Sequence, residues 1–243
     1  MQNKPKILVP VRVLEGESLP EGTAELLENA HVVLLGYHVV PEQTAPGQMR
    51  MQFEEKAKDR LDELEEMLES GGATVETRLV FTKEGQKTID RMIYEHDCLA
   101  VLDPDAIGPI ESVLVPVRGT VGLGRIARVV SGLFADTAAD ITLYHVTEED
   151  ESNEDAQMLL DGLVSKLADG GIDRERVTLT VQHGDDALDA ITDTAEFFDI
   201  VVMGESDPSI ATFVFGMPAE KVADRFFGPV FIVQRERSDD EFD

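Results

Sequence analysis

The chain of 243 residues contains one cysteine, no tryptophan and no long apolar run. The single cysteine, Cys98, excludes an internal disulfide and is typical of a reducing compartment. A membrane-spanning helix needs about 20 mainly apolar residues, and no such run is present. The amino terminus also lacks a signal-peptide pattern. We therefore expect a cytoplasmic protein without a membrane span.

Basic residues are scarce. The chain has 21 Lys and Arg residues against 49 Asp and Glu residues, which gives a formal net charge of −28. This excess argues against nucleic-acid binding, because a phosphate backbone would be repelled. The acids are spread over both halves, which indicates a halophilic protein whose self-repulsion is screened by salt. The alternative is an ordinary acidic protein.

Candidate catalytic and metal-binding groups are also few. The five histidines have no His or Cys partner at a ligand spacing, so we expect no metal site. Gly204-Glu205-Ser206 resembles the start of a nucleophile elbow, but Pro208 stands where the second glycine is needed. We therefore predict no catalytic residues and no enzyme activity.

One short stretch occurs twice, as KILVPVR (6–12) and as SVLVPVR (112–118). Each is an apolar run bounded by polar or charged residues, which is typical of a buried parallel strand. Both halves continue with alternating strands and helices. The predicted strands are 7–11, 31–40, 74–81, 98–102, 113–117, 141–146, 177–181, 200–203 and 230–233. The predicted helices are 21–28, 51–69, 86–94, 124–134, 155–167, 186–197 and 218–225.

This alternation predicts right-handed βαβ units and parallel sheets. The predicted fold class is α/β, with two doubly wound, Rossmann-like domains over residues 1–110 and 111–235. The first domain is truncated, because the second copy of the repeated strand begins within ten residues of Leu102. Residues 236–243 form a charged tail that we expect to be disordered.

Three stretches resemble the universal stress protein family. They are the repeated opening strand, DIVVMGES (199–206) and FGMPAEKVADRFFGPVFIVQR (215–235). The chain is similar to a tandem, UspA-like member of haloarchaeal type. The resemblance implies an adenine nucleotide alpha hydrolase-like fold and a role in stress response.

Family members that bind ATP have a glycine after the fourth strand and a second glycine three positions on. Nine residues later comes a glycine followed by Ser or Thr. Such glycines let backbone amides approach phosphate at a helix amino terminus. Here Gly204 and Gly216 match, whereas Asp207 and Met217 replace a glycine and the hydroxyl residue, and Pro218 removes an amide donor. The implied nucleotide-site positions are Val115, Pro116, Val117, Arg118, Gly204, Glu205, Ser206, Gly216, Met217 and Pro218.

These replacements act against a phosphate group. Each lost charge-assisted hydrogen bond costs about 1.5–3 kcal/mol, and Glu205 adds negative charge. Arg12 and Arg118 also occupy the position where ATP-binding relatives place an aspartate. We therefore expect no ATP cofactor, and a non-enzymatic regulatory or scaffolding module with a degraded ATP site.

The stretch RGTVGLGR (118–125) supports an alternative. Three glycines and two arginines between a strand and a helix could hold an anion at the carboxyl end of the sheet. The protein would then be a small-ligand sensor for a nucleotide or another anion. The glycine spacing is not that of a dinucleotide site. We therefore favour the interpretation that the stretch is a flexible turn whose arginines bridge surface acids.

Two apolar stretches indicate partners. Members of the family commonly pair their last strand with that of another domain or subunit, and an uncovered edge strand favours association. We therefore predict a homodimer through Val230, Phe231, Ile232 and Val233, with burial against the first domain as the alternative. The stretch SIATFVFGM (209–217) fills a vacated pocket or docks a protein partner.

Overall fold

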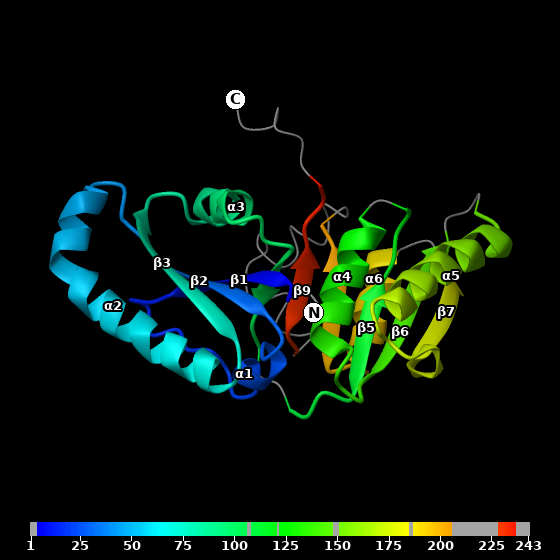
Figure 1. The fold of residues 1–243 in the computed structure, drawn as a ribbon. Coiled ribbons are helices and arrows are strands. Elements are labelled where there is room, and N and C mark those ends of the chain that lie inside the picture. Colours follow the sequence, from blue (N-terminus) through cyan, green and yellow to red (C-terminus); the bar gives the residue numbers. More distant parts are fainter. Residues whose placement is uncertain are drawn as a thin grey trace. The chain divides into compact units, whose positions relative to one another are not determined.

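A computed structural model describes residues 4–105, 108–120, 122–147, 151–184, 187–205 and 228–236. The chain divides into two compact units, Met1–Pro109 (unit 1) and Ile110–Asp243 (unit 2). Both units consist of parallel strands alternating with helices, which confirms the predicted α/β fold class (Figure 1). Within the described ranges, no helix is long and apolar enough to cross a membrane.

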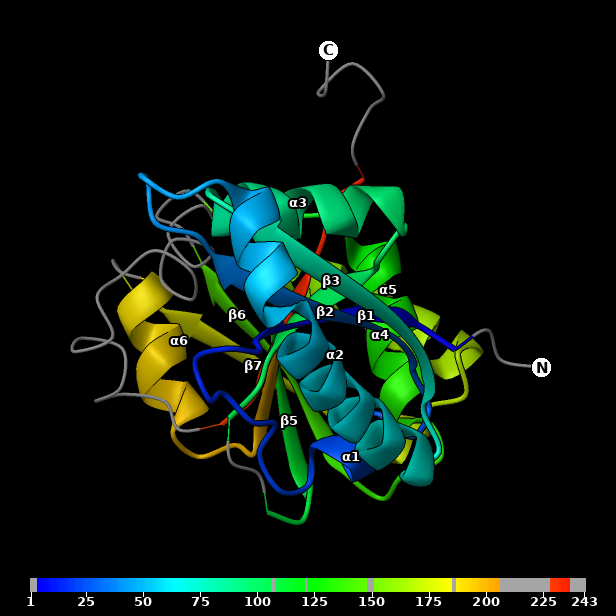
Figure 2. The ribbon, with the colours of Figure 1, turned by 90° about the vertical axis from the view of Figure 1, so that its left-hand side faces the viewer.

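Unit 1 contains four strands in the order β3-β2-β1-β4. The strands are β1 (Lys6–Arg12), β2 (His31–Val39), β3 (Thr74–Thr82) and β4 (Ala100–Asp103). The pairs β1–β2, β1–β4 and β2–β3 are parallel. The helices are α1 (Thr23–Leu26), α2 (Pro46–Ser70) and α3 (Gly85–Glu95). Figure 2 shows the long helix α2 in front of this sheet.

The helices α2 and α3 cover opposite faces of β2. A Cβ atom on Gly36 would lie 2.8 Å from the side chains of Leu61, in α2, and Val13. The next residue, Tyr37, instead lies beside Gly85 at the start of α3. Adjacent strand residues point to opposite faces, so the two helices form the outer layers. A Cβ atom at position 36 would therefore force the side chains of Leu61 and Val13 to shift.

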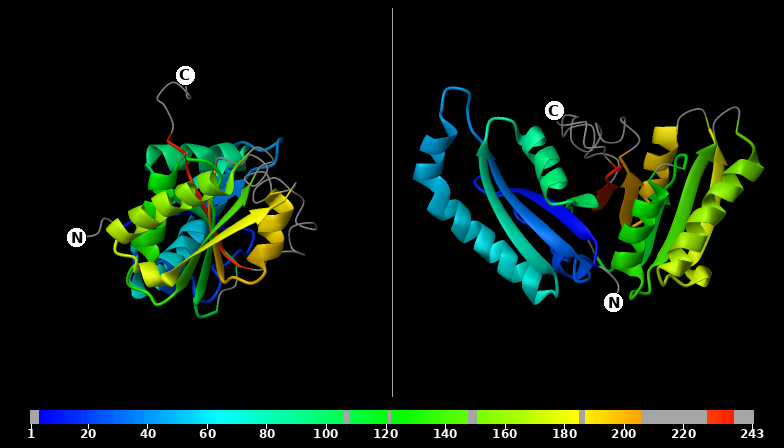
Figure 3. Two further views of the ribbon diagram at one scale, coloured as in Figure 1. Left: turned by 90° about the vertical axis from the view of Figure 1, so that its right-hand side faces the viewer. Right: turned by 45° about the horizontal axis from the view of Figure 1, so that its top comes forward.

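The described part of unit 2 contains five strands in the order β9-β8-β5-β6-β7. They are β5 (Ser112–Pro116), β6 (Asp140–Thr147), β7 (Val177–His183), β8 (Ile200–Gly204) and β9 (Val230–Val233). The helices are α4 (Leu123–Phe134), α5 (Asn153–Asp169), the 3₁₀ turn η1 (Arg174–Arg176) and α6 (Ala187–Ala195). Helices α4 and α5 pack together, and Figure 3 shows α5 and α6 flanking the sheet.

The apolar face of α6 packs on β6 and its neighbouring strands. Tyr144 and Val146 form a buried cluster with Leu114, Met203 and Ile232, and α6 covers this cluster. Burial of these apolar side chains is the main favourable contribution to the stability of this layer.

The long helices of the two units bury the same residue types at the same spacing. In α2 the buried residues are Ala57, Leu61, Leu64 and Leu68, and in α5 they are Ala156, Leu160, Leu163 and Leu167. This i, i+4, i+7, i+11 pattern forms one apolar stripe along each helix. Each helix is followed by two glycines, and the second has a positive φ, 102° at Gly72 and 94° at Gly171. The same helix–turn unit therefore occurs in both halves.

The predicted strands all occur, with ends shifted by at most two residues. One helix start was predicted wrongly. Helix α2 begins at Pro46, whereas the sequence pattern predicted a helix only from residue 51. Proline is tolerated in the first turn of a helix, where its missing N–H has no intrahelical acceptor. The predicted helix 218–225 lies outside the described residues.

Shortening Leu160 to alanine tests the core between α5 and its sheet. Leu160 is fully buried, so Leu160→Ala should lower the free energy of unfolding by about 2–5 kcal/mol. Met158 is 73% exposed on the same helix, and Met158→Ala should change it by no more than about 0.5 kcal/mol. Urea unfolding followed by circular dichroism measures both. Equal losses of unfolding free energy in the two variants would show that the apolar stripe of α5 does not stabilise the core.

Candidate functional site

The parallel strands of unit 2 end at one edge of their sheet, where open α/β folds bind ligands. Strands β5 and β8 are neighbours, with Val113 opposite Ile200. Their ends bring six predicted site residues to this edge: Val115, Pro116, Val117 and Arg118 from β5 and the residues after it, and Gly204 and Glu205 from the end of β8. The other predicted positions, Ser206, Gly216, Met217 and Pro218, lie outside the described residues, as does Asp207.

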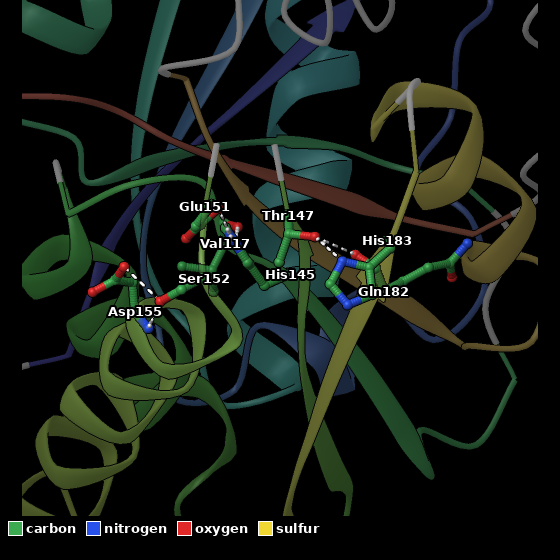
Figure 4. Close-up of polar contacts among 8 residues, drawn as sticks. All are labelled: Val117, His145, Thr147, Glu151, Ser152, Asp155, Gln182 and His183. Atoms are coloured by element: carbon green, nitrogen blue, oxygen red, sulfur yellow. Dashed lines mark hydrogen bonds and ion pairs between the residues drawn. The ribbon is translucent and has the colours of Figure 1, made fainter. Parts of the chain in front are cut away.

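His145 joins three elements at this edge (Figure 4). The side chain is 3% exposed, and its Nδ1 lies 2.7 Å from the carbonyl oxygen of Val117. Its Nε2 lies 2.8 Å from Oε2 of Glu151. A carbonyl oxygen only accepts hydrogen bonds, so Nδ1 carries a proton and donates it to Val117. The second contact then requires one further proton between Nε2 and the carboxyl group.

Glu151 immediately precedes the amino-terminal cap of α5. Ser152 is the cap residue, and its hydroxyl accepts a hydrogen bond from the N–H of Asp155 at 3.2 Å. The same hydroxyl donates to the carboxylate of Asp155 at 2.7 Å. This cap satisfies an amide that the helix leaves unpaired. His145 therefore ties the end of β5 to the start of α5.

The backbone of Val117 is fully used within the unit. Its N–H donates to the carbonyl of Tyr144 at 2.8 Å, and its carbonyl accepts from His145. Both backbone groups of Val117 therefore form hydrogen bonds with residues of β6. A ligand at this position would meet a backbone whose donor is already engaged.

A second polar group lies at the ends of β6 and β7 (Figure 4). Oγ1 of Thr147 is 2.6 Å from Nδ1 of His183, and the hydroxyl of Tyr144 donates to Oε1 of Gln182 at 2.6 Å. These side chains satisfy one another across the two strands. Within the described residues, no group of three or more His, Cys, Asp or Glu side chains could hold a metal ion.

Glu205 is bound to the chain that follows β9. Its N–H donates to the carbonyl of Val233 at 2.7 Å, and its carboxylate accepts from the N–H of Arg235 at 3.1 Å. The carboxylate of Glu205 thus places a fixed negative charge next to Gly204. The resemblance implies that Gly204 is the first glycine of the phosphate-binding pattern.

The glycine-rich turn before α4 has an unusual backbone. Gly119 and Gly122 have φ angles of 65° and 79°, which favour glycine. Within the described part of the chain, a Cβ atom on Gly119, Gly122 or Gly124 would meet no atom within 4 Å. The first two glycines are therefore required by their backbone conformation and not by close packing. Among the described residues, no atom fills the space beside these three glycines, and Arg118 next to them is exposed.

Arg12 occupies the same position in unit 1 as Arg118 in unit 2, and unit 1 uses its side chain internally. Its Nε donates to the hydroxyl of Tyr37 at 3.1 Å, and its Nη1 lies 3.4 Å from the carboxylate of Glu15. Its backbone N–H donates to Glu17. The hydrogen bond to Tyr37, followed by the charges of Glu15 and Glu17, raises the pKa of Arg12 above its ordinary value.

Asp103 ends β4 at the corresponding edge of unit 1. Part of its side chain is open to solvent, but the surrounding protein desolvates the carboxyl group. This desolvation, followed by repulsion from Asp105 and Glu17, raises the pKa of Asp103 to about 6. Unit 1 therefore holds a readily protonated carboxyl group and a paired arginine at its carboxyl edge.

Sequence reasoning missed both the His145 bridge and the Arg12 contacts. It treated the histidines only as metal ligands and the arginines as replacements for an acid. The available signal was a histidine within the apolar strand 141–146, because a buried imidazole needs hydrogen-bond partners.

Solved structures of known proteins share this architecture, whereas sequence comparisons find no match. No protein-family model matches the chain, and no curated protein matches its sequence. Among solved structures, a universal stress protein from Archaeoglobus fulgidus DSM 4304 is 18% identical with a TM-score of 0.61, covering 97% of each chain. A putative universal stress protein from Pseudomonas aeruginosa UCBPP-PA14 is 16% identical with a TM-score of 0.50, over 96% of this chain and 94% of that chain. The likeness shows that this chain has the fold of these universal stress proteins.

Removing the Glu151 carboxylate should destabilise unit 2. Glu151→Ala leaves a nitrogen of the buried His145 side chain without its partner, which should cost about 1–3 kcal/mol of unfolding free energy. The exposed Glu196 in the same unit serves as the control, and Glu196→Ala should change stability by about 0.5 kcal/mol or less. Urea unfolding at pH 7 compares them. An equal effect of the two substitutions would contradict the bridge.

The pKa of Asp103 predicts a pH-dependent stability. An aspartate has a pKa of about 3.9 in an unfolded chain, so the folded state holds the Asp103 proton more tightly. Its contribution to stability is full below about pH 4 and is lost as the pH rises through 6. Asp103→Asn should therefore stabilise the protein more at pH 7 than at pH 4. Chemical unfolding at both pH values measures this, with Asp59→Asn as the control for loss of one charge. The prediction would be contradicted if Asp103→Asn and Asp59→Asn changed the free energy of unfolding by the same amount at both pH values.

Proposed function

We propose that this protein is a non-enzymatic regulatory or scaffolding module of the universal-stress-protein type that does not use ATP. The observation that carries the proposal is the internal pairing of polar groups where the opening strands end. Arg12 is bound by Tyr37, Glu15 and Glu17, and the backbone of Val117 is bound by β6. Groups that already have partners gain less from a ligand, because each new hydrogen bond must replace an existing one.

The charge at the edge of unit 2 supports the same proposal. Glu205 follows Gly204, and Arg118 takes the place of the acid that ATP-binding relatives are expected to have. The resemblance further places Asp207 and Met217 at positions that should offer a bare backbone and a hydroxyl group. An anionic triphosphate would meet fixed carboxylates in a chain of net charge −28.

A non-enzymatic role is favoured by the state of the histidines at this edge. Both ring nitrogens of His145 are bound, and Nδ1 of His183 is bound by Thr147. A general base must reach the proton that it abstracts, and His145 is 3% exposed and already occupied. These contacts fit side chains that fix the strand ends.

A second candidate is the small-ligand sensor. No described residue fills the space beside Gly119, Gly122 and Gly124. These glycines lie at the amino terminus of the 12-residue helix α4, which favours a small anion there. Inorganic phosphate is the simplest probe. A rise in melting temperature with phosphate that Arg118→Ala abolishes would support the sensor over the scaffold.

The remaining expectations concern location and partners. A cytoplasmic location, a halophilic origin and a homodimer through Val230–Val233 stay predictions. Strand β9 pairs in parallel with β8, and Phe231, Ile232 and Val233 are buried. A charge at these positions would therefore disturb folding as well as association. The apolar stretch 209–217 lies outside the described residues.

Thermal unfolding with ATP tests the proposed function. We expect no change in melting temperature with ATP, whereas a ligand at 100 times its dissociation constant would stabilise the fold by about 2.7 kcal/mol. The matched variant Asp207→Gly with Met217→Ser restores two elements of the ATP-binding pattern and should gain an ATP-dependent rise. A clear rise with the unchanged protein would contradict the degraded-site proposal.

A further inference from the structure

Strand β7 contains no charged residue along its whole length. Its sequence, VTLTVQH, lies in a chain of which 29% of residues are Asp, Glu, Lys or Arg, so seven average residues would carry about two charges. The strand stands last in the order of unit 2 and pairs in parallel with β6. Figure 3 shows it foremost in the left-hand view. Edge strands are ordinarily protected by charge, proline or bulges, because their unpaired backbone groups bind other strands.

The duplicated fold offers an internal comparison. The repeated opening strand aligns Pro10 with Pro116, and the pairing of residues between strands can be followed outward from these two positions. From Pro10 they lead through β2 to Arg78 in β3. From Pro116 they lead through β6 to Thr180 in β7. The same path makes Glu76 the counterpart of Thr178.

The two strands differ at these equivalent positions. In β3, Arg78 forms an ion pair with Glu76 and also donates to the carbonyl of Thr77 at 2.7 Å. Strand β3 therefore carries both signs of charge at the end of its unit's strand order. In β7 both charged residues are replaced by threonine. Strand β7 therefore has the charge-free composition of an internal strand, although it stands at the end of its unit's strand order. Strand β3 stands at the equivalent position of unit 1 and carries charged residues there.

The outer edge of β7 is also regular. All seven residues from Val177 to His183 pair with consecutive residues of β6, without a bulge. Apolar and polar residues alternate up to Gln182, which is the pattern of a half-buried strand. A straight strand of seven residues spans about 23 Å, which is enough to template another strand.

We propose that the outer edge of β7 pairs with β7 of a second copy of this chain. The partner strand runs antiparallel about a two-fold axis, so the same patch is used by both copies. Two chains of net charge −28 repel each other, and an uncharged strip lets their backbones approach without placing carboxylates opposite each other. Threonines then face threonine or glutamine across the axis. This inference goes beyond the proposed function and does not depend on it.

Paired charge variants test the interface. Thr178→Glu with Thr180→Glu places like charges across the axis, and Thr178→Lys with Thr180→Lys does the same with the opposite sign. We expect the unchanged protein to be dimeric by sedimentation velocity and each variant alone to be monomeric. An equal mixture of the two variants should form a heterodimer, because opposite charges then face each other. The measurement is made in about 0.3 M potassium chloride, where the Debye length is about 6 Å.

The matched control places two glutamates on the exposed face of α5. Met158→Glu with Ser165→Glu adds the same net charge at two solvent-exposed positions outside β7 and should leave the dimer unchanged. Circular dichroism verifies that each variant is folded. Hydrogen exchange on the unchanged protein gives an independent readout, because protection of the β7 amides should fall on dilution.

Several outcomes would overturn the proposal. These are a monomeric unchanged protein, a glutamate variant that remains dimeric, or folded variants that stay monomeric when mixed. Protection of β7 that is independent of concentration would also overturn it. A dimer that persists in the glutamate variant would favour the predicted interface through β9. The ATP experiment tests the proposed function independently of all these outcomes.

Discussion

The parallel pairing of each opening strand with the second strand of its unit is the constraint on which the rest of the structure depends. Strand β1 pairs with β2 over seven residues, and β5 pairs with β6 over five. The central residues of these strands are fully buried, because helices cover both faces. Parallel neighbours require a crossover connection, which α1 and α4 supply between these strands. The same requirement places α2 between β2 and β3, and α5 between β6 and β7.

The two units use this shared frame differently at its carboxyl edge. The strand registers place Gly36 of unit 1 and His145 of unit 2 at equivalent positions. In unit 1 the absence of a side chain lets Leu61 pack against the strand, and Arg12 is held by Tyr37. In unit 2 an imidazole occupies the position and connects β5 to α5. The two units thus share the buried frame and differ at the polar edge.

Strands β3 and β7, which end the strand orders of the two units, differ in their charged residues. A chain of net charge −28 repels its own copies over most of its surface. The Glu76–Arg78 pair gives β3 the charge that protects an edge, and β7 lacks it. Strand position alone therefore does not define an interaction surface. The difference becomes visible only when the equivalent strands are compared.

The sequence by itself determined the α/β class, the repeated opening strand and most element positions. Local periodicity encodes these features, because a buried strand or an amphipathic helix is recognisable from its own residues. The prediction that Asp207 and Met217 replace a glycine and a hydroxyl residue rests on the resemblance to a known family. The start of α2 at Pro46 was missed, because proline signals both a loop and a first helical turn. Only the tertiary structure decided that Arg12 meets Tyr37, that His145 joins Val117 to Glu151, and that Thr180 stands where Arg78 does. The first two contacts join residues 25 and 28 positions apart, and all three depend on strand register, which a strand's own sequence does not specify.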